Sequence, residues 1–252
     1  MNLKLIRTLT TVSQKKLYNI LVQFLKKSGY MNIIKSSMYI IAEGEIPVTL
    51  IAHLDTVSED FYNTVPDMCL YDKDQDILHV VTGSTLDDRL GVYSIIEIIM
   101  AGYRPNVIFT LGEELGGIGA EELVQRFKKC SFSNYFMIEL DRRGEKDSVY
   151  YTCSNKKFEE YINSFGFETA VGSFSDCLII GEVWDIAAVN LSCGYMLEHT
   201  SLEYAHLEWT HKTIEKVKDI LEDWVDTDNY PCGPFKYNIK SKNKIKDYHL
   251  IF

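Results

Sequence analysis

The spacing of apolar residues along the chain predicts alternating strands and helices. Between residues 13 and 28 apolar positions recur every three or four residues and Gly29 follows, which indicates an amphipathic helix with a glycine after its last turn. Short apolar runs predict strands at 37–42, 48–52, 78–81, 106–111, 134–140, 148–153 and 187–192. Longer periodic runs predict further helices at 91–100, 120–129, 156–165 and from 200 to about 225.

This alternation predicts an α/β protein built on one sheet, and 252 residues suit a single domain of that class. No apolar run approaches the ~20 residues that a membrane span needs. The first ten residues lack the apolar core and cleavage site of a signal peptide, and six cysteines show no CxxC spacing. We therefore expect a cytoplasmic protein with reduced thiols and no membrane partner.

The net charge of −10 argues against a nucleic-acid partner, because phosphate binding needs a basic face. A local exception is the segment 228–252, which contains five lysines and only two aspartates. We expect this Lys-rich tail to be a solvated arm, although its aromatic residues also suit packing against the domain.

Two adjacent carboxylates follow the predicted strand at 106–111. Glu113 and Glu114 stand between Gly112 and Gly116, at a strand end where ligands of α/β proteins usually bind. Neighbouring carboxylates repel each other, so either both lie in solvent or a cation draws them together. Taken alone, the pair favours solvent, because such pairs are common on exposed loops.

His53 and Asp55 directly follow the predicted strand at 48–52. Two residues apart in an extended segment, they point to the same side, so the aspartate can accept a hydrogen bond from one ring nitrogen and leave the other for a metal. A histidine satisfied by a chance acidic neighbour is the simpler interpretation of this pair alone.

Further acids and a histidine stand at other element ends. Asp87 and Asp88 open the helix at 91–100, where one acid suffices as a cap and the spare one could bridge two metal ions. Asp141 ends the strand at 134–140. His199 precedes Thr200-Ser-Leu-Glu203, which matches a capping box and predicts that the last helix begins there.

Five segments in order, HLDTV, LDDRLG, GEELGG, IELD and GYMLEHTSLE, resemble the motifs of the co-catalytic di-zinc exopeptidases, peptidase clan MH. They span residues 53–203. The resemblance implies a three-layer α/β/α fold around a mixed, mostly parallel sheet. It also implies that His53, Asp87 and Asp141 bind one zinc ion, that Glu114 and His199 bind the other, that Asp87 bridges both, that Asp55 orients His53 and that Glu113 is the general acid/base.

The spacing between the motifs narrows the choice of branch within this family. His53 and Asp87 are 34 positions apart, and Asp141 and His199 are 58 apart, too few for the inserted lid or dimerisation domains of other branches. The resemblance thus implies a single catalytic domain over residues 1–227, similar to the single-domain aminopeptidases, that cleaves N-terminal peptide or similar amide bonds. It also leads us to expect an oxyanion donor, with Tyr195 as a candidate.

The ligand set of two imidazoles and three carboxylates suits two zinc ions and is also open to Co²⁺ or Mn²⁺. Two alternatives remain open at the level of sequence. The same site could hydrolyse N-acyl or other non-peptide amides, or the chain could be a non-catalytic binding domain, against which the intact Glu113 argues. The oligomeric state is also open.

Overall fold

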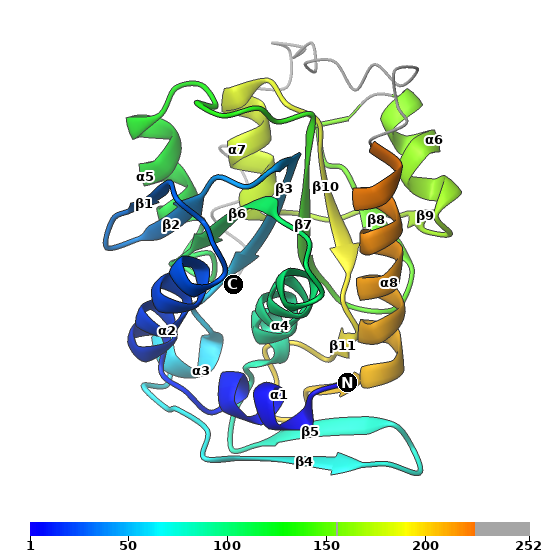
Figure 1. Cartoon of the computed structure of the whole chain (residues 1–252). Helices are drawn as coiled ribbons and strands as arrows, with labels where there is room; N and C mark the ends of the chain where they lie inside the picture. The colour runs from blue at the N-terminus through cyan, green and yellow to red at the C-terminus, as the bar shows by residue number, and fades with distance from the viewer. Residues whose placement is uncertain (155, 225–252) are drawn as a thin grey trace.

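The computed structural model describes residues 1–154 and 156–224, so the predicted Lys-rich tail at 228–252 lies outside the described residues. At its centre is an eight-stranded sheet with the order β1-β2-β6-β3-β7-β10-β8-β9 (Figure 1). Its strands are β1 (Ile33–Lys35), β2 (Tyr39–Ala42), β3 (Ile46–His53), β6 (Pro105–Thr110), β7 (Phe136–Arg142), β8 (Asp147–Val149), β9 (Glu168–Thr169) and β10 (Ala188–Ser192).

The middle of this sheet is parallel. β6, β3, β7 and β10 pair in parallel as neighbours, and the antiparallel strands β2 and β8 flank them. All residues of β6 and all but Ile46 of β3 are buried, as expected for parallel strands covered on both faces. The predicted mixed, mostly parallel sheet is confirmed.

Helices cover both faces of the sheet and complete three layers (Figure 1). Successive β3 residues point to opposite faces, so that Leu50 belongs to one apolar cluster and Ile51 to the other. The first cluster is packed by α1 (Leu3–Thr10), α2 (Gln14–Lys27), α4 (Leu86–Met100), α6 (Lys156–Ser164) and α8 (Leu207–Asp223). The second is packed by α5 (Ile118–Arg126) and α7 (Asp176–Trp184). No helix in the described ranges is long and apolar enough to cross a membrane.

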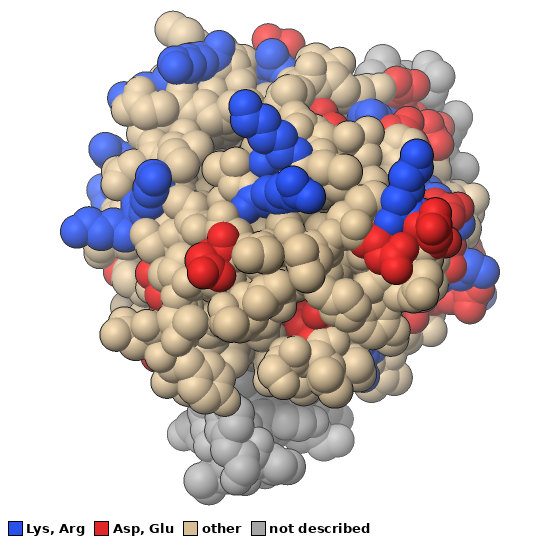
Figure 2. Space-filling model, turned by 90° about the horizontal axis from the view of Figure 1, so that it is seen from below, with Lys and Arg blue, Asp and Glu red and all other residues tan. Residues whose placement is uncertain are grey.

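A second sheet of four antiparallel strands lies below α1 and α4 in Figure 1. Its strand order is β11-β12-β5-β4. The strands are β4 (Met68–Asp72), β5 (Ile77–Val81), β11 (Tyr195–Met196) and β12 (Tyr204–His206). A short helix, α3 (Val57–Asp60), comes before β4 in the chain. One face of this sheet adds Cys69, Leu78 and Ala205 to the first cluster. Figure 2 views the molecule from this side, where uncharged side chains cover much of the surface and charged ones form small separate groups.

Two sequence predictions are wrong in this part of the chain. The last helix begins at Leu207 rather than at Thr200, because residues 204–206 pair with β5 as strand β12. The capping box is therefore absent, and Glu203 has a different partner. The strand predicted at 148–153 ends at Val149, since Tyr151 adopts a positive φ of 53° in a turn.

Gly91 lets α4 pack directly against the end of β7. A Cβ atom at this position would lie 2.2 Å from the carbonyl oxygen of Leu140 and 2.4 Å from Oδ1 of Asp88. Both distances are far below van der Waals contact, and one neighbour is backbone that cannot rotate away. The glycine thus fixes how closely the start of α4 approaches the residue before Asp141.

Replacing Gly91 by alanine should therefore destabilise the fold. Overpacking typically costs about 1–3 kcal/mol, and the contact with backbone places Gly91→Ala at about 2 kcal/mol or above. Urea unfolding measures the loss. Met100→Ala, at an exposed position on the same helix, is the matched control and should change stability by less than about 1 kcal/mol. Equal stability of the two variants would contradict the packing argument.

Candidate metal centre

Five sequence-predicted residues meet at the carboxyl end of the parallel strands, where α/β folds usually bind ligands. His53 is the last residue of β3, and Asp141 is the last but one of β7. Asp87 lies in the first turn of α4, Glu114 in the loop after β6, and His199 in the loop between β11 and β12. Elements from most of the chain thus deliver one side chain each to the same place.

The contacts divide these five residues into two groups that share Asp87. Nε2 of His53 lies 3.0 Å from Oδ1 of Asp87 and 3.5 Å from Oδ1 of Asp141. Nε2 of His199 lies 3.1 Å from Oδ2 of Asp87 and 3.0 Å from Oε2 of Glu114. Each oxygen of Asp87 therefore faces one imidazole, and each imidazole faces one further carboxylate.

These spacings fit divalent cations. Ligand atoms at about 2.0–2.1 Å from a tetrahedral zinc ion lie roughly 3.3 Å from each other, close to the separations between the histidine nitrogens and carboxylate oxygens. His53, Asp87 and Glu114 also place one ligand atom each within 4.8 Å of one another. Mixed nitrogen and oxygen ligands of this kind suit zinc and neighbouring transition metals.

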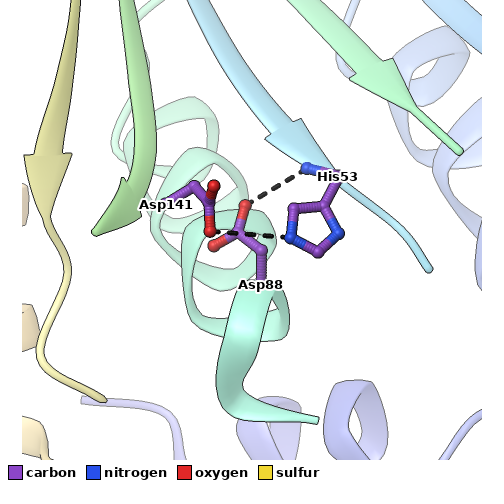
Figure 3. A group of neighbouring side chains, drawn as sticks. All are labelled: His53, Asp88 and Asp141. Atoms are coloured by element: carbon purple, nitrogen blue, oxygen red, sulfur yellow. Dashed lines mark hydrogen bonds and ion pairs between the residues drawn. The ribbon is translucent and has the colours of Figure 1, made fainter. Parts of the chain in front are cut away.

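Asp88 competes with Asp87 for the ligand role, and the geometry separates them. Asp88 lies with His53 and Asp141 in a third group of possible ligands (Figure 3). Its Oδ2 accepts a hydrogen bond from the backbone N–H of His53 at 3.2 Å, and its Oδ1 accepts one from Gly91 at 3.0 Å. Both oxygens of Asp88 therefore hold backbone N–H groups, whereas those of Asp87 face the two histidines.

Asp55 connects His53 to the Glu114 loop. Its Oδ2 accepts a hydrogen bond from the backbone N–H of Glu114 at 3.0 Å. Its Oδ1 lies 3.5 Å from Nδ1 of His53, but its own carbonyl oxygen is nearer to that nitrogen, at 3.1 Å. Asp55 therefore holds the imidazole with its backbone and side chain together.

Glu113 lies beside these groups without joining either. It makes none of the short contacts to the histidines that Glu114 and Asp87 make. Burial raises the pKa of its carboxyl group well above the ordinary value, and the nearby acids Asp141 and Asp176 raise it further. A carboxyl group that favours the proton and is free of ligand contacts suits proton transfer.

Tyr195, the candidate oxyanion donor, has its hydroxyl hydrogen bond committed to another residue. Its buried hydroxyl group donates a hydrogen bond to Oδ1 of Asp141 at 3.0 Å. The side chain of Asn190 holds the same residue from the other side, since its Oδ1 accepts from the backbone N–H of Asp141 at 3.0 Å. Both residues therefore orient Asp141.

Sequence reasoning gave no ligand or catalytic role to three other buried acids near the site. Ser175 and the backbone N–H of Cys177 donate to Oε2 of Glu139, and Asp176 is fully buried with no hydrogen-bond partner for either oxygen. Glu139 sits inside the IELD motif, which was the only signal available for it. Glu203 was interpreted as part of a capping box.

The centre concentrates negative charge with little compensation. Among residues 1–154 and 156–224, Arg89 is the buried side chain that carries a permanent positive charge. Burial, and after it the neighbouring carboxylates, raises the pKa of Asp141 and of Asp88 well above the ordinary value. The carboxyl groups gathered here are those of Asp55, Asp87, Asp88, Glu113, Glu114, Glu139, Asp141 and Asp176. Such a cluster needs protons or bound cations.

No family model matches the chain, and no curated protein matches it by sequence. Solved structures do match its fold. A tripeptidase from Staphylococcus aureus aligns with a TM-score of 0.69 at 12% identity, over 87% of this chain and 96% of that one. The aminopeptidase PepT from Bacillus cereus gives 0.68 at 13% over 87% and 97%. A TET aminopeptidase from a Thaumarchaeota archaeon gives 0.67 at 12% over 87% and 96%. The chain has the α/β fold of these peptidases, as predicted.

The buried acids generate a prediction for the metal-free protein. Burial raises the pKa of Asp176 and of Glu203 to about 8, against ordinary values of about 3.9 and 4.3. Between pH 5 and 8 the folded state therefore binds more protons than the unfolded state, so stability should fall as pH rises, by up to about 1.4 kcal/mol per pH unit for each such group. The raised pKa of His199, held by Asp87 and Glu114, acts in the same direction.

Urea unfolding in chelator at pH 5, 6, 7 and 8 measures this slope. Asp55 and Asp87, whose pKa values are lowered by their histidine contacts against the effect of burial, stay ionised throughout this window and leave the slope unchanged. Asp176→Asn should flatten it. A stability that is constant or rises over the same range would contradict the prediction.

Proposed function

We propose that this protein is a metal-dependent aminopeptidase that binds two divalent metal ions. The observation that carries the proposal is the bidentate placement of Asp87, whose two oxygens each face a histidine that also faces a second carboxylate. His53, Asp87 and Asp141 would hold one ion, and Asp87, Glu114 and His199 the other. Zinc fits this set best, with Co²⁺ and Mn²⁺ as further occupants.

The residues around this centre support amide hydrolysis. Two divalent ions held by these ligands would polarise a scissile carbonyl and make water more acidic. Glu113, beside the ligands, accepts the proton of the attacking water and delivers it to the leaving amine. Asp55 holds the ring of His53, and Tyr195 with Asn190 holds Asp141, so each keeps a ligand in place during turnover.

Three of the fold neighbours are named as aminopeptidases or a tripeptidase, which supports a peptide substrate. We propose short peptides with a free N-terminus, cleaved after the first residue. A panel of aminoacyl, dipeptide, tripeptide and N-acyl substrates tests this choice. Turnover of the N-acyl substrates alone would favour a non-peptide amidohydrolase, and no turnover of any substrate by metal-loaded protein would favour a binding domain.

Metal content is the first test of the dinuclear centre. Elemental analysis of the protein after dialysis against zinc should give about two ions per chain, and chelation should abolish turnover. Chelation should also lower the melting temperature, because a ligand bound only by the folded state stabilises it by about 2.7 kcal/mol per site at one hundred times its Kd. Retention of full activity by metal-free protein would refute the proposal.

The adjacent glutamates provide the second test. Glu113→Gln removes the proposed base with little change in shape, so it should keep both ions and lose about 10²–10⁴-fold in kcat. Glu114→Gln removes a charged ligand and should lose metal as well as rate. Metal content and kcat are measured on both variants. If Glu113→Gln loses a metal while Glu114→Gln keeps two, the roles are reversed.

A further inference from the structure

Glu203 joins the start of α4 to the loop that carries His199. It lies four residues after His199 and is 1% exposed. Its Oε2 accepts hydrogen bonds from the backbone N–H groups of Thr85 at 2.6 Å and Leu86 at 2.8 Å, and its Oε1 accepts one from Asp87 at 3.3 Å. One buried carboxylate therefore binds three consecutive N–H groups, the last of which belongs to the residue shared by both ligand groups.

These N–H groups lack a local partner. The first N–H groups of a helix have no acceptor within it, and a side chain just before the helix usually supplies one. Here Thr85 precedes α4, but its side chain does not cap the helix and its hydroxyl group donates to the carbonyl oxygen of Thr10 instead. Glu203 supplies the missing acceptor from more than a hundred residues away.

A fourth hydrogen bond joins the same two segments. The backbone N–H of His199 donates to Oγ of Ser84 at 3.0 Å. Ser84 is itself held, because its backbone N–H donates to Oγ of Ser58 at 2.6 Å. Two crosslinks, through Ser84 and through Glu203, thus accompany the contact of 3.1 Å between the His199 ring and Asp87.

The two ligand groups depend on these crosslinks to different degrees. His53 and Asp141 lie on β3 and β7, which pair directly in the central sheet. His199 lies on a loop, with its side chain 50% exposed. Loosening the crosslinks leaves His53 and Asp141 in place but frees His199 to move relative to Asp87.

We propose that Glu203 is a positioning residue that holds Asp87 and His199 at the separation needed to bind the second divalent ion. This inference rests on the proposed dinuclear centre and adds to it a residue that touches neither metal nor substrate. It acts through the backbone of a ligand, as outer partners of metal ligands do.

Calorimetric titration of metal-stripped protein with Zn²⁺ tests the inference independently of turnover. Wild type should show two binding steps, and His199→Ala identifies the step that belongs to the group of Asp87, Glu114 and His199. Glu203→Gln should weaken that step by about 10–100-fold and change the other by less than about threefold. Glu208→Gln, an exposed acid nearby on α8 that pairs with Lys212, is the matched control and should leave both steps unchanged.

Ser84→Ala is the second variant and decides the matter if Glu203→Gln does not fold. It removes the acceptor of the His199 N–H and should weaken the same step alone. If the folded Glu203→Gln protein binds zinc as wild type does, or if both steps weaken equally, the positioning role is overturned and the two-metal proposal stands. If Glu203→Gln does not fold, unchanged binding in Ser84→Ala overturns the positioning role in the same way. Fewer than two binding steps in wild type overturns the proposed function itself, and this inference with it.

Discussion

Repulsion between carboxylates is the constraint that governs this structure. Two like charges 4 Å apart cost about 4 kcal/mol at an effective dielectric constant of about 20, and eight carboxyl groups gather at one end of the sheet. The fold manages them by giving several acids backbone N–H partners. Asp88 binds those of His53 and Gly91, Glu203 those at the start of α4, Glu139 that of Cys177 and Asp55 that of Glu114. Asp87, Asp141 and Glu114, which lack such side-chain partners, face the histidines instead.

The sheet explains why these groups meet at all. Parallel strands end at the same edge, so the residues that end β3 and β7 are brought together by pairing alone. Close packing then fixes the third contributor, because Gly91 allows the start of α4 to lie against Leu140 with almost no space between them. The remaining two ligands come on loops, which need hydrogen bonds from outside their own segment to hold them.

Local pattern predicted much of this architecture. The helix predicted at 13–28 corresponds to α2 and the strand at 48–52 lies within β3, since both depend on periodicity within one segment. The candidate ligands were assigned from the resemblance carried by five motifs in order, because each charged pair taken alone favoured a simpler interpretation. The start of α8 was not predicted, because residues 204–206 pair with a strand more than 120 positions earlier. The hydrogen-bond partners of Glu203 were mispredicted for the same reason. A glutamate can accept from N–H groups nearby in sequence, as in a capping box, or from those of a distant helix, and the residue type does not distinguish the two. The helix α7 lacked a clear periodicity because it packs against both the sheet and α5.

The order of the ligands along the chain also has a kinetic meaning. His53, Asp87 and Asp141 are all present once the first 141 residues exist, and two of them stand on strands that pair with each other. His199 and Glu203 come 58 and 62 residues after Asp141. On a ribosome the chain grows from its N-terminus at about 5–20 residues per second, so His53, Asp87 and Asp141 precede His199 by several seconds. Asn190 and Tyr195, which hold Asp141, belong to the same later stretch. The first candidate group therefore gains its supports at the stage of synthesis that also supplies His199 and Glu203.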